Sequence, residues 1–232
     1  MFLHEGLGSV SLWKDVPARV AERTGCGIFV YSRRGYGASD ALGAPREPDY
    51  MHREADVVLP ALLDDGRIER PILFGHSDGA SIALLFAAAF PGRARALVLE
   101  APHVFVEDLS VASIAAAKTA FETTDLRSKL ARHHADAAGA FRGWNDIWLD
   151  ERFRAWNIED RLALVDVPVL VVQGEDDEYG TLAQIRSIEA HVRDVTTVVL
   201  ERCAHSPHRA RPDAVLDAVA AFVARVEASE RT

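Results

Sequence analysis

The hydrophobic residues of the chain fall into short continuous runs, separated by longer stretches in which they recur every three or four positions. The continuous runs have the length and apolar content of buried parallel strands, and they lie at 28–31, 71–74, 96–99, 167–172 and 195–200. The periodic stretches predict helices with an apolar face at 11–23, 51–63, 80–90, 182–190 and 212–226. Strands that alternate with helices in this way predict an α/β protein with a doubly wound, mostly parallel sheet.

The alternation stops between His103 and Arg161. This stretch contains no strand-like run, but it has two helical faces, one of them aromatic, with Trp144, Trp148, Phe153 and Trp156. We interpret it as a helical cap inserted after the strand at 96–99, lying over the carboxyl ends of the strands, where open sheets hold their ligands. The predicted organisation is therefore a first core part at 1–102, a cap at 103–161 and a second core part at 162–232.

Composition narrows the range of partners. The chain has 232 residues, a net charge of -9 and no long run of Lys or Arg, which argues against nucleic acid or an anionic membrane surface and favours a small-molecule substrate. Only Cys26 and Cys203 occur, and no apolar stretch approaches the ~20 residues that cross a bilayer, so we expect a cytoplasmic protein. The sequence does not predict an oligomeric state.

A sharp turn is predicted directly after the run at 71–74. The residues Gly75-His76-Ser77-Asp78-Gly79 form a G-x-S-x-G motif between a predicted strand and a predicted helix. Glycines at both ends of the motif relieve backbone crowding and leave the hydroxyl of Ser77 exposed above the sheet. Ser77 is therefore the candidate nucleophile.

A serine nucleophile needs a base to accept its proton and an acid to orient that base. Asp177 follows the strand at 167–172 and His205 follows the strand at 195–200, which gives the chain order Ser77, Asp177, His205. Asp176 is the alternative acid, one residue away, and His208 is the alternative base. These positions predict a catalytic triad at the carboxyl edge of the sheet.

The loop at 4–9 is the second candidate for chemistry. Attack on a carbonyl creates a negative oxygen, which needs backbone N–H donors already in place. We expect one donor from Gly6 in this loop and the other from the N–H of Asp78, at the start of a helix.

A metal site is not expected. His133 and Asp136 are one turn apart on a predicted helix face, but two ligands do not make a site, and no H-E-x-x-H or paired C-x-x-C motif accompanies them. We expect no cofactor, and we expect His133, Trp144 and Trp148 to line the substrate cleft instead.

Taken together, these motifs resemble those of the capped, serine-dependent α/β-hydrolases over nearly the whole chain. The matching segments are His4 to Ser9, Arg34 to Ser39, Gly75 to Gly79, Gly174 to Asp177 and His205 to Pro207. The Ser-Asp-Gly elbow and the helical cap are most similar to the biphenyl-hydrolase-like branch. The resemblance implies an enzyme that cleaves esters or related acyl compounds.

The chain departs from the family pattern at two places. Members usually have two strands before the oxyanion loop, whereas here only Met1 to Leu3 precede it, so we expect either that the start is truncated or that these strands are missing. Glu5 stands where the family usually has glycine. This second departure bears on the choice of substrate.

The expected function is a serine hydrolase that cleaves a small carboxylic ester through an acyl-enzyme. The same triad can serve a thioesterase or a carbon–carbon bond hydrolase of ring-cleavage products. A third possibility, from another class, is a non-catalytic ligand-binding module on a hydrolase scaffold.

Glu5 and Asp78 place two carboxylates beside the predicted oxyanion donors. One interpretation is that Asp78 stabilises the positive end of its helix while Glu5 faces solvent or pairs with an arginine such as Arg33 or Arg34. The other, implied for Asp78 by the resemblance, is that one of the two carboxylates binds a cationic group of the substrate.

Overall fold

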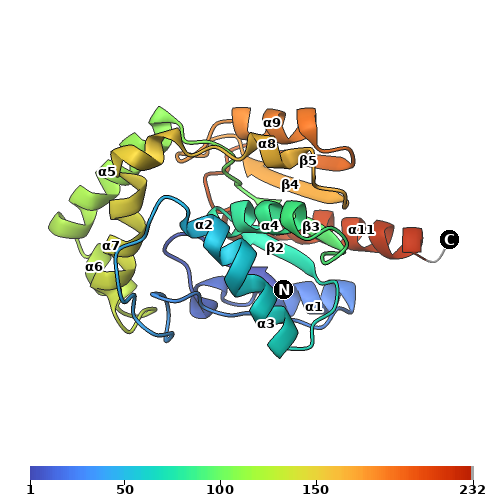
Figure 1. Cartoon of the computed structure of the whole chain (residues 1–232), viewed down its shortest axis with the longest axis horizontal. Coiled ribbons are helices and arrows are strands. Elements are labelled where there is room, and N and C mark those ends of the chain that lie inside the picture. The colour runs from blue at the N-terminus through green and yellow to red at the C-terminus, as the bar shows by residue number, and fades with distance from the viewer. Residues whose placement is uncertain (231–232) are drawn as a thin grey trace.

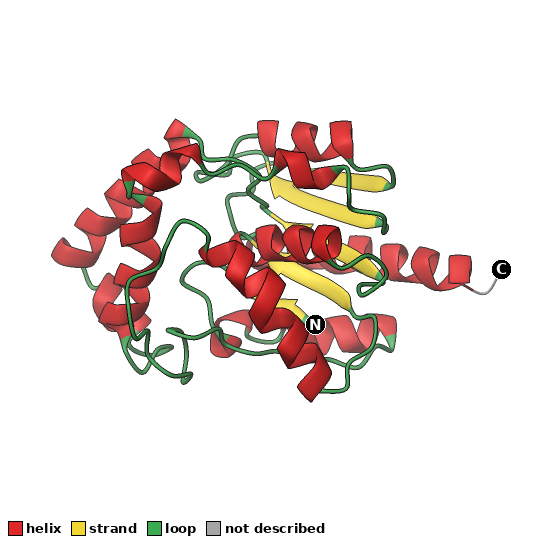
Figure 2. Cartoon of the chain, viewed as in Figure 1, coloured by secondary structure: helices red, strands yellow, loops and turns green. Residues whose placement is uncertain are grey.

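The computed structural model describes residues 1–230 and contains one five-stranded sheet. Its strands run in the order β1 (Phe2–Leu3), β2 (Ile72–His76), β3 (Ala96–Glu100), β4 (Val169–Gly174) and β5 (Val195–Leu200). Every neighbouring pair is parallel, and helices cover both faces of the sheet (Figure 2). The predicted fold class, a doubly wound parallel sheet, is confirmed.

The strand predicted at 28–31 is reduced to a single bridge. Val30 pairs with Phe2 beyond β1, and the Phe2 N–H donates to the carbonyl of Phe29 at 2.9 Å. Ile28 and Phe29 are each 36% exposed, and within residues 1–230 no further strand pairs with their outer edge. The expectation that two strands are missing before Met1 stays a prediction.

One face of the sheet is covered by the buried helix α4 (Asp78–Ala89) and a helix that runs from 50 to 65. The latter consists of α2 (Tyr50–Arg53), the π-helical segment η2 (Glu54–Val58) and α3 (Leu59–Asp65). Pro60 lies at the start of α3. Proline lacks an N–H and its ring crowds the preceding turn, and the wider π-helical turn before it makes room for the ring. The helix predicted at 51–63 is thus present with a local irregularity.

The opposite face is covered by α1 (Val16–Thr24), which follows the short 3-10 helix η1 (Val10–Trp13), and by α11 (Pro212–Glu230). The helix α9 (Ala183–His191) follows β4, and α10 (Pro207–Ala210) precedes α11. None of the helices within residues 1–230 combines the length and hydrophobicity needed to cross a bilayer.

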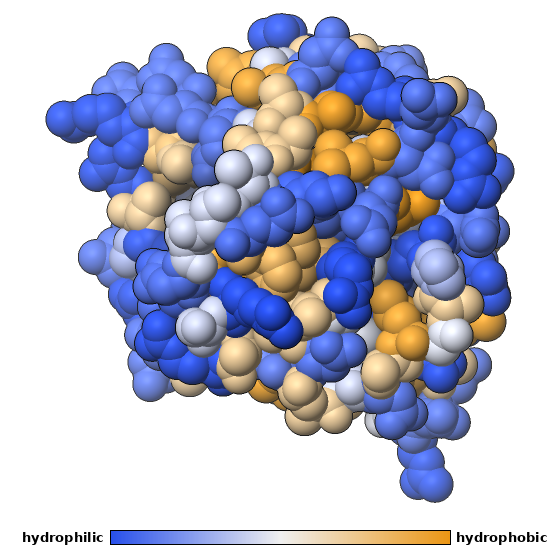
Figure 3. Space-filling model, turned by 90° about the vertical axis from the view of Figure 1, so that its left-hand side faces the viewer, coloured by the Kyte–Doolittle hydropathy of each residue, from blue (hydrophilic) through white to orange (hydrophobic). Residues whose placement is uncertain are grey.

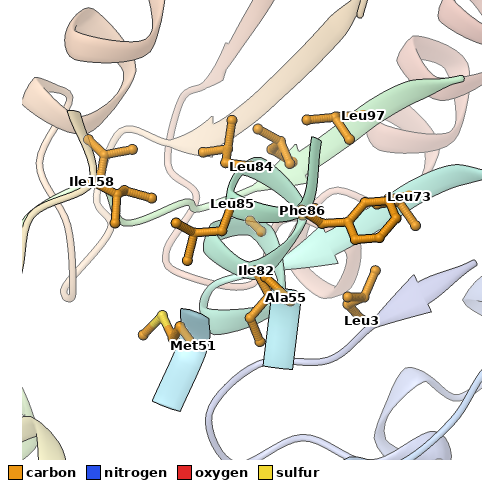
Figure 4. Packing of buried hydrophobic residues seen from close by; sticks show 14 of the residues in the cluster. Leu3, Met51, Ala55, Leu73, Ile82, Leu84, Leu85, Phe86, Leu97 and Ile158 are labelled. Atoms are coloured by element: carbon orange, nitrogen blue, oxygen red, sulfur yellow. The ribbon is translucent and has the colours of Figure 1, made fainter. Parts of the chain in front are cut away.

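The hydrophobic core is centred on α4. Every residue of this helix except Ala89 is buried, as expected for a helix that is apolar on all sides. Figure 4 shows its side chains, among them Ile82 and Phe86, packed between strand residues such as Leu73 and the residue Met51 of α2. This packing fixes the position of the turn from which α4 starts.

The inserted stretch contains α5 (Asp108–Thr123), α6 (Leu126–Leu130), α7 (Ala137–Trp148), the 3-10 helix η3 (Glu151–Ala155) and α8 (Glu159–Leu162). In Figure 1, α5, α6 and α7 stand to one side of the sheet, while α8 packs on α4 and α9. An antiparallel bridge between Phe105 and Asn157 joins the two ends of the insertion. We propose that 103–161 forms the cap, with 1–102 and 162–232 as the core.

The outer surface of this region is mostly hydrophilic. Viewed from the side of α5 and α7, hydrophobic residues occur in separate patches between hydrophilic ones (Figure 3). Trp144 and Trp148 on α7 are only 7% and 1% exposed. The aromatic face of α7 is therefore turned inward.

Candidate active site

The backbone turns sharply at Ser77, between β2 and α4. Ser77 has φ 53° and ψ -119°, a strained conformation for a residue with a side chain. A Cβ on Gly75 would lie 2.4 Å from the carbonyl oxygen of Gly79, and a Cβ on Gly79 would lie 2.0 Å from that of Leu3. Both positions thus require glycine, as the sequence motif predicted.

Asp177 and His205 meet at the end of the sheet. Nδ1 of His205 lies 2.8 Å from Oδ1 of Asp177, which also accepts the N–H of Tyr179 at 2.8 Å. Burial alone would raise the pKa of Asp177, but the hydrogen bond and charge of His205, together with the Tyr179 N–H, hold this pKa below its ordinary value. A carboxylate at this position fixes the proton on Nδ1 of His205 and leaves Nε2 free to accept a proton.

The two alternatives from the sequence occupy other places. Asp176 is exposed, whereas Asp177 is 7% exposed. His208 is buried and its Nδ1 lies 2.5 Å from Oε2 of Glu100. Glu100, His208 and His76 form a buried group whose ligand atoms lie within 4.8 Å of one another, but the bond between His208 and Glu100 already pairs two of the three, so we assign no ion to it.

A cavity of about 150 Å³ brings Ser77 and His205 together. Within residues 1–230 no hydrogen bond joins the hydroxyl of Ser77 to His205, a contact that often tightens only with substrate bound. The other lining residues come from the loop after β1, the ends of the strands and the cap, and they are Glu5, Gly6, Leu7, His76, His103, Ile114, Trp144, Trp148, Tyr179 and Ser206.

The two expected oxyanion donors flank Ser77. Gly6 lines the cavity, and its N–H has no acceptor among residues 1–230. Asp78 is the first residue of α4, where backbone N–H groups have no partner within the helix. A Cβ on Gly6 would lie 2.2 Å from Cδ1 of Trp144, so the cap itself requires glycine at this position.

The side chain of Asp78 does not face the cavity. It is buried, its Oδ2 accepts the hydroxyl of Tyr50 at 2.8 Å, and it lies 3.6 Å from Nη2 of Arg33. Trp148 donates its indole N–H to the same Tyr50 hydroxyl at 3.1 Å. This placement contradicts the expectation that the Asp78 carboxylate binds a substrate cation, because Arg33 and Tyr50 already occupy it.

Glu5 lines the cavity but has partners of its own. Its Oε2 lies 3.4 Å from Nδ1 of His76 and its Oε1 lies 3.8 Å from Nη2 of Arg209. Burial would raise the pKa of Glu5, but the hydrogen-bonding contact with His76 and the charge of His76 lower the pKa of Glu5 well below the usual range. Glu5 is thus ionised and pairs with His76 and Arg209. The expected arginine partner is present, but it is Arg209; Arg33 donates instead to the backbone carbonyl of Glu5 at 3.0 Å.

His76 connects this loop to the loop that carries His205. Its Nε2 lies 2.7 Å from the carbonyl oxygen of His205, on the opposite side of the ring from Glu5. Burial would lower the pKa of His76, but the Glu5 carboxylate raises it above its ordinary value. The sequence pattern did not reveal this role, although His76 lies inside the elbow motif.

His133 does not line the cavity. It lies in the turn after α6, where its Nδ1 is 2.9 Å from the hydroxyl of Ser11, and Asp136 caps α7 by accepting the N–H of Gly139 at 2.8 Å. The expectation that His133 and Asp136 share a helix face is therefore wrong, because His133 lies in a turn and Asp136 precedes the first residue of α7. Trp144 and Trp148 do line the cavity, as expected.

Two further cavity residues were not expected. His103 follows β3 directly and is 2% exposed, and Tyr179 follows Asp177, with its ring 4.8 Å from that of His205. The signal that could have found His103 is its position just after a strand, the same criterion that selected Asp177 and His205.

Comparisons with known proteins agree with the fold. The model of the family described as "Alpha/beta hydrolase family" matches residues 1–218. A Mycoplasma pneumoniae protein whose name provisionally classes it with esterases and lipases is 25% identical, over 98% of this chain and 89% of that protein.

Solved structures share the fold. One reported for carboxylesterases of Nitrososphaera gargenis has a TM-score of 0.79 at 16% identity, covering 98% of this chain and 90% of that one. The proline iminopeptidase of Mycobacterium smegmatis has a TM-score of 0.73 at 22% identity, covering 99% and 90%. At these identities the likeness shows the architecture and not the substrate.

Proposed function

Since the chain belongs to the alpha/beta hydrolase family, we propose that it is a serine hydrolase that cleaves small carboxylic esters through an acyl-enzyme. The observation that carries this proposal is the hydrogen bond between His205 and Asp177, at 2.8 Å, beside a serine on a strained turn in the same cavity. The chemistry needs groups of this chain and water alone.

In the first half-reaction, the hydroxyl of Ser77 attacks the carbonyl carbon of the ester while Nε2 of His205 takes the proton. The negative charge that develops on the carbonyl oxygen is stabilised by the N–H groups of Gly6 and Asp78. The carbon–oxygen bond of the ester then breaks, the alcohol leaves with the proton from His205, and the acyl group remains on Ser77.

In the second half-reaction, water takes the place of the alcohol. His205 removes a proton from water, the resulting hydroxide attacks the acyl carbon, and the bond to Ser77 breaks as His205 returns the proton to the serine oxygen. The products are a carboxylic acid and the free enzyme. Asp177 stays ionised throughout and stabilises the imidazolium form of His205.

The cavity supports a small substrate. Its volume is about 150 Å³, and Trp144, Trp148 and Ile114 give it apolar walls. Thioesters and the carbon–carbon substrates of ring-cleavage hydrolases remain the alternative reactions for the same groups. A non-catalytic binding module is the alternative from another class.

Fluorophosphonate labelling followed by a panel of aryl and alkyl esters and thioesters tests the proposal. We expect labelling at Ser77, and we expect Ser77→Ala to abolish both labelling and turnover without a change in melting temperature. Asp177→Asn should lower kcat by about 10³- to 10⁴-fold, because the wrong tautomer of His205 is then stabilised, while Asp176→Asn should have little effect. Unchanged ester turnover in Ser77→Ala would end the proposal.

A further inference from the structure

We infer that His103 hydrogen-bonds an uncharged polar group of the substrate, so that the preferred ester carries a hydroxyl or a similar group next to the cleaved bond. The inference rests on the proposed function and deepens it by naming a substrate class. It starts from a buried histidine in the cavity wall that the triad does not use.

The ring of His103 lacks a hydrogen-bond partner. The residue is 2% exposed and lines the cavity with Ser77 and His205. Within residues 1–230 its ring makes no hydrogen bond, and Nδ1 is the nitrogen that is fully buried without a partner. Buried side-chain nitrogens are nearly always paired, and one that is unpaired in a substrate cavity calls for an explanation. Nδ1 lies on the side of Gly180, 3.6 Å from where a Cβ on that residue would stand, so Nε2 is the nitrogen left to meet a group in the cavity.

The ring cannot turn to another partner. The backbone of His103 is fixed by Ser81, whose hydroxyl donates to the His103 carbonyl at 2.6 Å. The ring packs against Trp148 with centroids 5.0 Å apart, and a Cβ on Gly180 would lie only 3.4 Å from its Cε1. Packing on these sides holds the imidazole in the cavity wall.

The neighbours of His103 are already paired with other groups. Trp148 donates its indole N–H to Tyr50, and Nδ1 of His205, whose ring centroid is 5.7 Å away, bonds to Asp177. A hydrogen-bond partner for His103 must therefore come from the cavity, as water in the free enzyme and as a substrate group in the complex.

The chemistry of His103 favours a neutral partner. Burial, with the charge of His205, lowers the pKa of His103 to about 3, so the imidazole is uncharged near neutral pH. A neutral imidazole offers one N–H donor and one acceptor nitrogen, which suits a hydroxyl whichever nitrogen carries the proton. It offers no charge to bind a carboxylate or an ammonium group.

The consequence is a preference between substrates of equal shape. A methyl group at this position would displace water and leave a buried nitrogen unpaired, whereas a hydroxyl would pair with it. For a net hydrogen bond between neutral groups, the expected preference in kcat/KM is roughly two- to tenfold.

The test uses two pairs of esters that differ only by a hydroxyl in place of a methyl group. The acyl pair is p-nitrophenyl 3-hydroxybutanoate and p-nitrophenyl 3-methylbutanoate, and the alcohol pair is 2-hydroxypropyl butanoate and 2-methylpropyl butanoate. We measure kcat and KM for the parent, His103→Phe, His103→Leu and His103→Asn, with the exposed His191→Phe as the matched control. Each rate is divided by the rate of hydroxide hydrolysis, which removes differences in intrinsic reactivity.

We expect the parent to favour the hydroxyl ester in at least one pair, and the pair that responds shows whether His103 contacts the acyl or the alcohol part. His103→Phe and His103→Leu should abolish this preference and improve the relative rate of the methyl ester, His103→Asn should retain part of it, and His191→Phe should leave it unchanged. His103→Leu serves where the larger phenylalanine prevents folding, as judged by melting temperature.

Two results overturn the inference while leaving the proposed function in place. One is turnover of all four esters with no preference in either pair. The other is a preference that persists in the apolar variants, or a loss that affects both members of a pair equally. A protein that hydrolyses none of the esters and is not labelled by a fluorophosphonate overturns the proposed function and this inference together.

Discussion

At the residue scale, the largest difference between expectation and structure concerns Asp78. The residue after the proposed nucleophile carries a carboxylate that lies against Arg33 at 3.6 Å, with both side chains about 1% exposed. A buried charge of this kind is tolerated because it is paired, and removing one partner leaves the other uncompensated. We therefore expect the Asp78 side chain to matter for stability, apart from the proposed role of its backbone N–H.

We therefore predict that Asp78→Asn lowers the free energy of unfolding by about 3–5 kcal/mol. The control is Asp64→Asn, because Asp64 pairs with Arg93 at the shorter distance of 2.7 Å but is 68% exposed, and exposed pairs contribute about 0–1 kcal/mol. Denaturant unfolding of the parent and both variants measures the difference. Equal losses in the two variants would mean that burial is not what makes the Asp78 pair important.

Glu5 and His76 give a second prediction at this scale, on pH. The pKa of Glu5 is lowered in the folded state, so its contribution to stability is present above its unfolded pKa of ~4.3 and is lost as pH falls. The pKa of His76 is raised, so its contribution is present below ~6.5 and is lost as pH rises through the folded pKa. Both contributions are complete only between about pH 4.3 and 6.5.

We expect the difference in unfolding free energy between the parent and Glu5→Gln to be largest in this window and to shrink on both sides. Urea unfolding of both proteins at pH values between about 3.5 and 9, roughly one unit apart, measures this difference in unfolding free energy. A difference that is constant across the whole range would show that the contact between Glu5 and His76 does not titrate with folding.

At the scale of elements, the cap helix α7 fixes the shape of the oxyanion loop. Trp144 stands over Gly6, and in the proposed mechanism the N–H of Gly6 points at the substrate oxygen. The loop and α7 are far apart in sequence, so their fit depends on how the insertion folds back over the sheet.

We predict that Gly6→Ala lowers kcat/KM by about 10²-fold or more, because its Cβ, 2.2 Å from Trp144, forces the loop or the ring to shift. Gly43→Ala is the control, since its Cβ would meet nothing closer than 3.8 Å. Trp144→Ala removes the clash, so Gly6→Ala should lower kcat/KM by less in the Trp144→Ala background than it does in the parent. Strictly additive effects of the two substitutions would contradict the proposed contact.

At the scale of the whole molecule, the substrate space is bounded by the strand ends and the helical insertion together. The cavity of about 150 Å³ has walls from the strand ends and from α5 and α7. Such a small space limits the acyl chain, because extra methylene groups need either a wider cavity or exposure to water.

We expect kcat/KM for p-nitrophenyl esters to be highest for short acyl chains and to fall at least tenfold, or ~1.4 kcal/mol in transition-state stabilisation, between butanoate and decanoate. Substituting Ile114→Ala, which enlarges the cavity, should move the optimum to longer chains. An optimum at long chains in the parent would show that the cap opens in solution well beyond the observed cavity.

The sequence by itself determined the strands β2 to β5 and the helices that alternate with them, the elbow at Ser77 and the positions of Asp177 and His205, whereas the strand expected at 28–31 is only a bridge. These follow from patterns that are local: continuous apolar runs, helical periodicity, glycines at a crowded turn and polar residues that come directly after a strand. Because parallel strands end at one edge of a sheet, residues after different strands meet there without further information.

Only the tertiary structure decided which side chains face the cavity. Arg33 reaches Asp78, His76 reaches Glu5, and His103 lines the cavity, although each pair or contact joins segments far apart in the chain. His133, placed on a helix by spacing alone, lies in a turn and contacts Ser11 instead. The direction of a side chain depends on long-range packing and on which charges are buried together, and neither is encoded in the local pattern of hydrophobic positions.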